Sequence, residues 1–218
     1  MSAVALAEES AIGSLSLRNE PVQARSAARL TGLLDAAATV IDELGYERLT
    51  TAMVAERAGA SIGTVYRYFP DRIAVLQALG ARNLDRVLSR AAEEIVDERH
   101  ENWVAAMSAA FDVLVESFRT EPGFRSIRVG DVIDLRPAPN PRTYNSIVAD
   151  SLFDGLVTRF DVTDTAEARF AFEAAIEISD ALAARAFSRD PAGEAGFLEA
   201  GRVATYATLL PFFGEPVR

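Results

Sequence analysis

Hydrophobic residues recur every three to four positions along most of the chain, which is the spacing of amphipathic α-helices. The first stripe predicts a helix over 26–44 that ends at Gly45. Its apolar positions are Leu30, Leu33, Leu34, Ala37, Ile41 and Leu44. A longer stripe follows Asp71, whose negative charge favours a helix start, and it predicts a long helix. Its apolar positions are Ile73, Leu76, Leu79, Leu84, Val87, Leu88 and Ile95.

The second half of the chain continues the same periodicity. Further helices are predicted over 103–118, 123–133, 144–160, 166–187 and 193–213. The segment over 135–141, Leu-Arg-Pro-Ala-Pro-Asn-Pro, contains three prolines and interrupts the helical pattern. No segment shows the two-residue alternation of a strand, so the predicted fold class is all-α.

Two short helices joined by a tight turn are predicted within residues 50–72. The first covers 51–58, and Thr50 or Thr51 can cap its N-terminus. Its apolar face consists of Met53, Val54 and Ala58. Gly59 then suits the left-handed backbone conformation that ends a helix. The turn between the two helices is short, because Ser61, which can cap the next helix, follows Gly59 by two positions.

The second short helix, over 62–69, is predicted to begin at a Ser61 cap. Ile62, Val65 and Phe69 share one side of it, at the spacing of a buried face. The other side is small or polar and consists of Ser61, Gly63, Thr64, Arg67 and Tyr68. Two helices, a glycine turn and an exposed polar face on the second helix are the features of a helix-turn-helix, which binds duplex DNA.

The charge distribution favours DNA binding for the first part of the chain only. The whole chain has a formal net charge of -10 and a pI near 4.7. Residues 1–17 contain two acidic residues and no basic residue. Residues 18–90 contain ten arginines and eight acidic residues, whereas residues 91–218 contain twelve arginines and twenty-two acidic residues. Phosphates would repel the last part. We therefore expect a helix-turn-helix domain over 25–71 and a larger helical domain over 72–218.

The N-terminal arm, predicted over 1–24, admits two interpretations. Arg18, Arg25 and Arg29 lie in it or just after it, and they could enter the minor groove as homeodomain arms do. An acidic residue, a proline and the absence of an aromatic anchor favour a solvated, flexible arm instead.

Several classes of protein are disfavoured by what the sequence lacks. No run of about 18 apolar residues occurs, so no membrane span is expected. The first residues lack the basic segment of a secretory signal. The chain contains no cysteine, which excludes disulfides and thiolate zinc sites and fits a reducing cytoplasm. These features predict a cytoplasmic protein that needs no cofactor and has no membrane partner.

Catalysis is the alternative that the sequence supports least. The single histidine, His100, lies in the polar run Asp-Glu-Arg-His-Glu-Asn between predicted helices, where we expect it to be solvated. The chain has no phosphate-binding glycine loop and no nucleophile elbow. Acidic pairs such as Glu93-Glu94 are explained by a solvent-facing surface. We therefore predict that the protein is not an enzyme.

Small, hydroxyl-bearing and aromatic residues are concentrated between 29 and 79, around the predicted helix-turn-helix. They are Tyr46, Thr50-Thr51, Val54-Ala55, Ala58-Gly59, Ser61-x-Gly63-Thr64-x-Tyr66, Tyr68-Phe69, Arg72 and Leu76. Together they resemble the DNA-binding domain of the TetR family of bacterial transcriptional regulators. Ala60 stands where the family often has valine and Arg72 where it commonly has lysine. The rest of the chain is similar to the family only in length and helical character.

This resemblance implies a homodimer that places one recognition helix of each protomer in the major groove of a palindromic operator. Tyr66 and Tyr68 are then expected to contact phosphates, and Arg67 to contact a base, with partial burial of the tyrosines and a phosphate contact by Arg67 as alternatives. Gly63 would allow close approach to DNA. The full set of expected DNA-binding residues is Thr50, Thr51, Ser61, Gly63, Thr64, Tyr66, Arg67, Tyr68 and Arg72.

The resemblance also implies that the C-terminal helices enclose an effector cavity, and that a bound small molecule changes the spacing of the recognition helices. The candidate cavity residues are Trp103, Met107, Phe111, Phe118, Phe124, Ile127, Arg128, Tyr144, Ile147 and Phe153, with Asp131 and Asn145 as further polar contacts. For each aromatic residue, ordinary core packing is the favoured alternative.

The last two helices are expected to form a four-helix dimer seam with a second copy. Its candidate residues are Phe170, Phe172, Ile176, Ala183, Phe187, Val203, Tyr206, Leu209 and Leu210, and Pro-Phe-Phe-Gly over 211–214 could cover its edge. The function implied by the resemblance is a repressor released from DNA by a small apolar or amphipathic effector. An activator and a helical scaffold acting through its acidic domain remain open.

Overall fold

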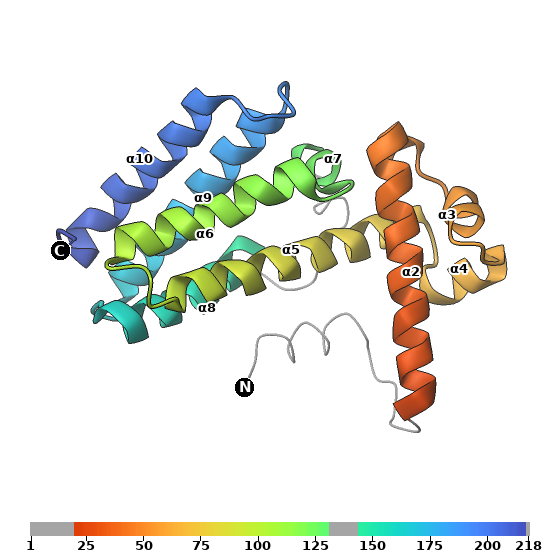
Figure 1. Ribbon diagram of the computed structural model, residues 1–218, viewed down its shortest axis with the longest axis horizontal. Coiled ribbons are helices and arrows are strands. Elements are labelled where there is room, and N and C mark those ends of the chain that lie inside the picture. The colour runs from red at the N-terminus through yellow and green to blue at the C-terminus, as the bar shows by residue number, and fades with distance from the viewer. Residues whose placement is uncertain (1–19, 131–143, 217–218) are drawn as a thin grey trace. The chain divides into compact units, whose positions relative to one another are not determined.

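The structure is a computed structural model of the 218-residue chain that describes residues 20–130 and 144–216 (Figure 1). Within these ranges the chain forms helices and turns and no strand, which confirms the all-α prediction. The helices are α2 (Glu20–Leu44), α3 (Thr51–Arg57), α4 (Ile62–Tyr68), α5 (Arg72–Val96), α6 (Trp103–Thr120), α7 (Phe124–Val129), α8 (Tyr144–Phe160), α9 (Ala166–Phe187) and α10 (Ala195–Phe213), with a 3₁₀ turn over Tyr46–Arg48.

The described residues fall into two compact units. The N-terminal unit lies within Met1–Asp85 and Pro122–Arg136, and the C-terminal unit within Arg86–Glu121 and Pro137–Arg218. The division falls inside α5 and groups α7 with the helix-turn-helix, whereas the sequence placed a boundary at 71/72 and assigned everything after it to one domain. None of the described helices has the length and apolar composition needed to cross a bilayer.

The core of the N-terminal unit is built on the buried stripe of α2. Leu33, Ala37 and Ile41 are fully buried and belong to one cluster with residues of α3, α4, α5 and α7. The other buried members are Leu34, Ala36, Ala38, Val40, Leu49, Val54, Ala55, Val65, Phe69, Val75, Leu76, Leu79 and Ile127. Leu44 was predicted to belong to the α2 stripe but is 40% exposed, because the chain turns away at Gly45, where φ is +84°.

Helix α7 packs against α2 within this unit. The amide of Gly123 donates to Asp42 Oδ1 at 3.3 Å. Gly123 has φ of +73°, and a Cβ placed on it would lie 3.1 Å from the carbonyl oxygen of Ala38. Backbone thus approaches backbone, which requires glycine. The predicted helix over 123–133 is described as far as Val129, and its last residues, like the proline-rich segment over 135–141, lie outside the described residues.

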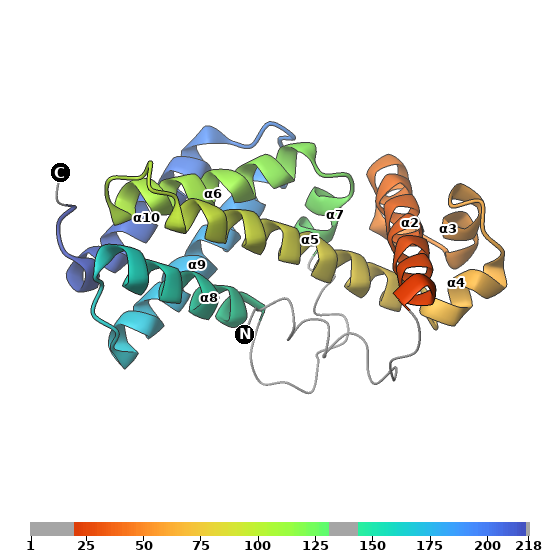
Figure 2. The same ribbon diagram turned by 60° about the horizontal axis from the view of Figure 1, so that its bottom comes forward.

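The C-terminal unit is a bundle in which α9 and α10 run side by side (Figure 2). Its core cluster combines α5, α6, α8, α9 and α10 around fully buried Ile95, Phe153 and Phe172. Between α9 and α10 the buried hydroxyls of Ser179 and Thr205 lie 2.6 Å apart. Helices α8 and α9 have the predicted bounds. Helix α10 begins two residues later than predicted, because Gly193 has φ of +86° and belongs to the preceding turn.

The close approach of Gly123 to Ala38 leads to a prediction about stability, for which Gly32 of α2 is the control position. Gly123→Ala should lower the free energy of unfolding by about 1–2 kcal/mol, because a side chain disfavours the left-handed conformation and the new Cβ would press on Ala38. Gly32→Ala should raise it by about 0.5–1 kcal/mol, because Gly32 is inside α2 and no atom lies within 4 Å of its added Cβ. Urea unfolding of both variants measures the two shifts, and shifts of the same sign would contradict the packing described.

Candidate DNA-binding surface

Helices α3 and α4 begin at the caps that the sequence predicted. Thr50 Oγ1 accepts a hydrogen bond from the Met53 amide at 3.2 Å, and Ser61 Oγ accepts one from the Thr64 amide at 3.2 Å. Gly59, in the turn between the helices, has φ of +58°, as a left-handed helix end requires. The local geometry of a helix-turn-helix therefore follows from the chemistry of these residues.

Helix α4 has one buried face and one exposed face. Val65 is fully buried and Phe69 is 4% exposed, which confirms both as core residues. Ile62 was assigned to the same face but is 44% exposed, because it is the first residue of the helix and lies at its open end. Tyr66, 54% exposed, and the exposed Arg67 lie on the outer face. The outer face of α4 is therefore accessible to a binding partner.

The hydroxyl groups expected to touch DNA already contact one another. The Tyr68 hydroxyl is 3.0 Å from Ser26 Oγ on α2, and Thr51 Oγ1 donates to the Tyr66 hydroxyl at 3.4 Å. Thr64 Oγ1 lies 2.9 Å from the Ser61 hydroxyl. These contacts hold the side chains in place, and each hydroxyl oxygen retains further hydrogen-bonding capacity.

The two arginines of the expected set differ in their surroundings. The Arg67 guanidinium lies over the Tyr68 ring at 5.2 Å from the centroid. Arg72 Nη1 donates to the carbonyl oxygen of Glu47 at 2.8 Å, which ties the start of α5 to the 3₁₀ turn. Because a guanidinium has five donors, Arg72 can keep this bond and still reach a phosphate. Both side chains are exposed, and Arg67, which lacks a backbone contact of this kind, is the better candidate for a base contact.

Ion pairs neutralise carboxylates of this unit. Arg57 makes two hydrogen bonds to Glu43, at 2.6 and 2.9 Å, and they lower the pKa of the Glu43 carboxyl. Arg82 Nη1 lies 2.7 Å from Asp35 Oδ1. Burial raises the pKa of the Tyr46 hydroxyl, with a smaller contribution from the neighbouring charge. The two ion pairs leave the net charge of the unit unchanged, but they offset the charge of two carboxylates that would otherwise repel phosphates.

Helix α2 is longer than predicted. It begins at Glu20, six residues before the expected start, so Arg25 and Arg29 lie on a helix and not in an arm. Both side chains are exposed. They are not in the DNA-binding set expected from the sequence, although their four-residue spacing is typical of a helix. Arg18 lies outside the described residues.

The candidate effector residues are divided between the two compact units. Within the C-terminal unit, Trp103, Met107, Phe111, Phe118 and Phe153 are buried, and Asn145 Nδ2 donates to Glu177 Oε2 at 2.8 Å. Phe124 and Ile127 are buried in the N-terminal unit, where Arg128 also lies, and Ile147 is 41% exposed. Asp131 and the side chain of Tyr144 lie outside the described residues.

Several of these aromatic side chains are already packed against other rings. Trp103 stacks on Tyr206 at a centroid distance of 5.8 Å, and its indole N–H donates to the carbonyl oxygen of Gly214 at 3.1 Å. Phe118 stacks on Phe187 at 4.7 Å. Core packing explains these positions, and an effector role for them stays a prediction.

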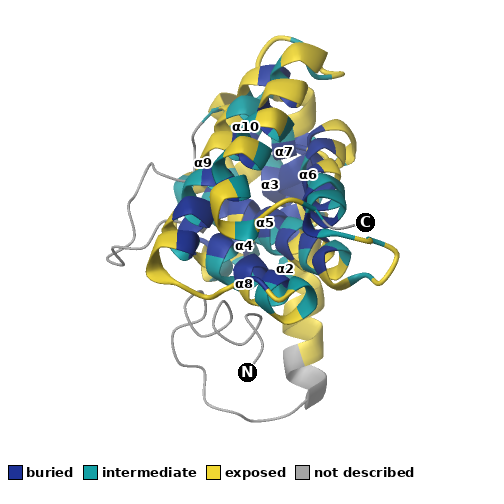
Figure 3. Cartoon of the chain, turned by 90° about the vertical axis from the view of Figure 1, so that its left-hand side faces the viewer, coloured by how far each residue is buried: buried dark blue, intermediate teal, exposed yellow. Residues whose placement is uncertain are grey.

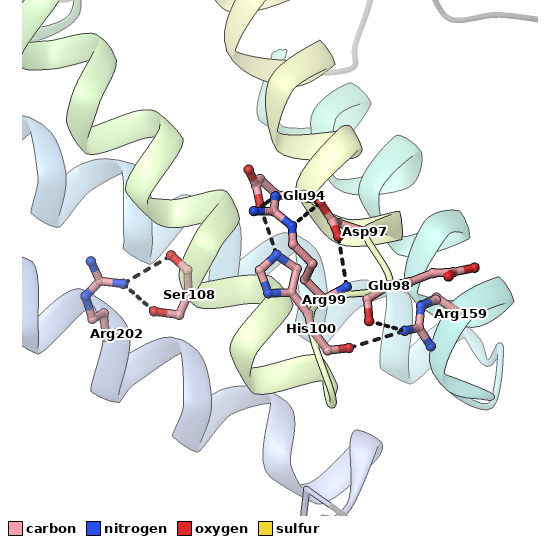
Figure 4. Close-up of polar contacts among 8 residues, drawn as sticks. All are labelled: Glu94, Asp97, Glu98, Arg99, His100, Ser108, Arg159 and Arg202. Carbon is pink, nitrogen blue, oxygen red and sulfur yellow. Dashed lines mark hydrogen bonds and ion pairs between the residues drawn. The ribbon is translucent and has the colours of Figure 1, made fainter.

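The single histidine belongs to a polar turn between α5 and α6 (Figure 4). His100 Nε2 lies 2.8 Å from Glu94 Oε2 and its side chain is only 17% exposed, so the prediction of a solvated histidine was wrong. Arg99 hydrogen-bonds Asp97 through its side chain and its amide and lowers the pKa of Asp97 to about 2. Arg159 of α8 donates to the His100 carbonyl at 3.3 Å. These contacts tie the turn to α8. Among the described residues no group of three or more potential metal ligands occurs.

Comparison with known proteins agrees with this geometry. The HTH-type transcriptional repressor KstR of Rhodococcus jostii is 41% identical over 58 residues, a match that covers 27% of each chain. The chain thus spans about a quarter of the length of this curated relative. A crystal structure of a TetR-family transcriptional regulator from Streptomyces coelicolor is 32% identical with a TM-score of 0.69, covering 84% of this chain and 99% of that one. RolR in complex with resorcinol shares the fold, at 19% identity and a TM-score of 0.56 over 87% of this chain and 90% of that one.

Two family models match the chain. The model of bacterial regulatory proteins of the tetR family matches residues 33–79, which contain the helix-turn-helix. The model of the tetracyclin repressor-like C-terminal domain matches residues 101–213, more than half of the chain. Since both halves match in the order of the family, the protein belongs to the TetR family of transcriptional regulators.

Proposed function

We propose that this regulator is a ligand-responsive repressor that binds a palindromic operator as a homodimer. The observation that carries the proposal is the exposed face of α4, with Tyr66, Arg67 and Gly63 beside a cap at Ser61. An α-helix fits the major groove of B-DNA, where an arginine can donate two hydrogen bonds to guanine. The backbone amides at the start of α4 can donate to a phosphate next to that groove.

Gly63 supports the proposal independently of the charged residues. A Cβ at this position would meet only Ser61 Oγ, at 3.9 Å, so the packing of the protein leaves room for a side chain. A glycine inside a helix costs about 0.5–1 kcal/mol relative to alanine. Packing within the protein does not explain why glycine occupies this position. Close approach of the DNA backbone to α4 would explain it.

Dimerisation is proposed to use the exposed apolar surface of α9 and α10 (Figure 3). Phe170 is 73% exposed, Val203 56% and Phe212 40%. A shallow groove on this surface is lined by Ala166, Glu167, Phe170, Ala171, Ala174, Thr208 and Phe212. A second copy that covered the same surface would form a two-fold interface, the commonest symmetry of homodimers.

Other residues expected at the seam face inward. Phe172, Ala183, Phe187 and Leu209 are buried in their own unit, which is the alternative of intradomain packing. These residues pack within the C-terminal unit. Only the exposed residues of α9 and α10, such as Phe170 and Val203, would contact a second copy.

The effector is proposed to be a small apolar or amphipathic molecule that favours a DNA-incompetent state. The resorcinol complex of RolR supports this chemistry by analogy within the fold. To move a regulator from 99% competent to 99% incompetent, the effector must bind the second state more tightly by about 5.5 kcal/mol. Repression would then be relieved by population shift and not by competition for the DNA surface.

Selection of duplexes from a random pool by the purified protein tests operator binding. We expect a palindromic consensus with half-sites about one helical turn apart, or 34–36 Å. Arg67→Ala should cost about 1–3 kcal/mol of binding free energy and relax the preference at one base of each half-site, because it removes a base contact. Titration of labelled duplexes carrying each base at that position measures both effects.

Arg189→Ala is the matched control, because Arg189 is exposed on the turn after α9 and should leave the affinity unchanged. Loss of affinity without any change in base preference would reassign Arg67 to a phosphate. Failure of the wild-type protein to enrich any sequence at low salt would count against operator binding and favour the scaffold function.

Phe170→Glu tests the dimer surface. We expect the molar mass in sedimentation equilibrium to fall from dimer to monomer at micromolar concentration, because a charge would be buried in the interface. Helicity should stay the same, since Phe170 is 73% exposed in the single chain. Val96→Glu, at a 54% exposed position at the end of α5, should remain dimeric. A dimeric Phe170→Glu variant would place the interface elsewhere.

A further inference from the structure

The first turns of α2 form an extension that precedes the residues matched by the family model. Helix α2 begins at Glu20, whereas the match to the family begins at residue 33. The extension contacts the proposed recognition helix. Ser26 Oγ lies 3.0 Å from the hydroxyl of Tyr68, the last residue of α4, and that hydroxyl is 3.5 Å from the Ser26 carbonyl oxygen. The start of α2 is therefore fixed beside the C-terminal end of α4.

This extension carries two positive charges that nothing described in the protein neutralises. Arg25 and Arg29 are exposed, and neither makes a hydrogen bond or ion pair with any residue in the described parts of the chain. Arg25 precedes Ser26 directly, and Arg29 follows Ser26 by three residues, on the neighbouring surface of the helix. Both guanidinium groups are thus attached close to the point where α2 meets α4.

Three of the four carboxylates of the same helix are engaged within the protein, and the side chain of the fourth, Glu20, lies outside the described residues. Asp35 pairs with Arg82, Asp42 accepts from the Gly123 amide, and Glu43 pairs with Arg57. These residues lie in the second half of α2. Among the side chains that the structure describes, the charged groups of α2 that have neither a hydrogen bond nor an ion pair are therefore the two arginines at its beginning.

Arg25 and Arg29 also repel each other. Residues four apart on a helix have Cβ atoms about 5–6 Å from each other, and like charges at this spacing destabilise a helix. An anion between or beside the two guanidinium groups would remove the repulsion. DNA phosphates are the anions that the adjacent recognition helix would bring to this place.

We propose that Arg25 and Arg29 bind phosphates of the operator outside the base pairs that α4 reads. The inference rests on the proposed operator binding. An α-helix with its side chains is about 10–12 Å wide, whereas the minor groove of B-DNA is about 6 Å wide, so α2 stays outside the groove. The contact is therefore to the backbone, which sets position and affinity without reading sequence.

Salt dependence of binding tests this contact on the full-length protein. The variants are Arg25→Gln, Arg29→Gln and their combination, with Arg189→Gln as the control, and the probe is the duplex enriched by the wild-type protein. Each phosphate contact contributes about 0.9 to the slope of log affinity against log salt concentration. Each substitution in a dimer removes two arginines, so the slope should fall by about 2, while the base preference and far-UV circular dichroism stay the same.

Shortening the duplex provides a second readout. Removing base pairs outside the selected consensus should weaken binding by the wild-type protein and leave the affinity of the double variant unchanged, because the variant no longer uses those phosphates. An unaltered salt slope in both single variants, with normal wild-type binding, would overturn the inference. A changed base preference would also overturn it, in favour of minor-groove reading. If the wild-type protein enriched no duplex, that result would contradict the proposed operator binding itself and not only the contact by the two arginines.

Discussion

The candidate DNA-binding surface depends on the burial of Val65 and Phe69 against the stripe of α2. Helix α4 has seven residues, and a helix of this length is not stable in isolation. Its conformation is maintained by the Ser61 cap and by these two apolar contacts, which fix its rotation about its own axis. Because one face must be buried, Tyr66 and Arg67 must face outward. The orientation of the polar residues is thus a consequence of apolar packing.

The sequence predicted the fold where local chemistry determines it. The caps at Thr50 and Ser61 and the left-handed Gly59 gave the bounds of α3 and α4 almost to the residue, since each acts within one helical turn. The beginning of α2 was missed because it lacks an apolar stripe and is held partly by Tyr68, 42 residues away. Ile62 was misassigned because periodicity does not show which apolar residue at a helix end finds a neighbour.

The C-terminal unit shows why its candidate sites were harder to predict. Phe170 and Phe172 are two positions apart on α9, about 200° around the helix, and one is 73% exposed while the other is fully buried. Residue type alone predicts the same burial for both phenylalanines. Only the packing of α9 against α10 determines which of them is buried. The candidate effector residues share this ambiguity, because an aromatic side chain such as Trp103 serves a core and a cavity wall with the same chemistry. Their separation between two compact units is a non-local property.

A chain with a formal net charge of -10 can still present a positive surface, because the arrangement of charges decides the local potential. In the N-terminal unit Arg57 and Arg82 neutralise Glu43 and Asp35. In these pairs a carboxylate offsets the charge of each arginine, and the arginine offsets the charge of a carboxylate that would otherwise repel phosphates. The arginines without such partners are then the ones that we expect to contact DNA. Arg67 on α4 is one, and the exposed pair at the start of α2 would extend the proposed contact beyond α4.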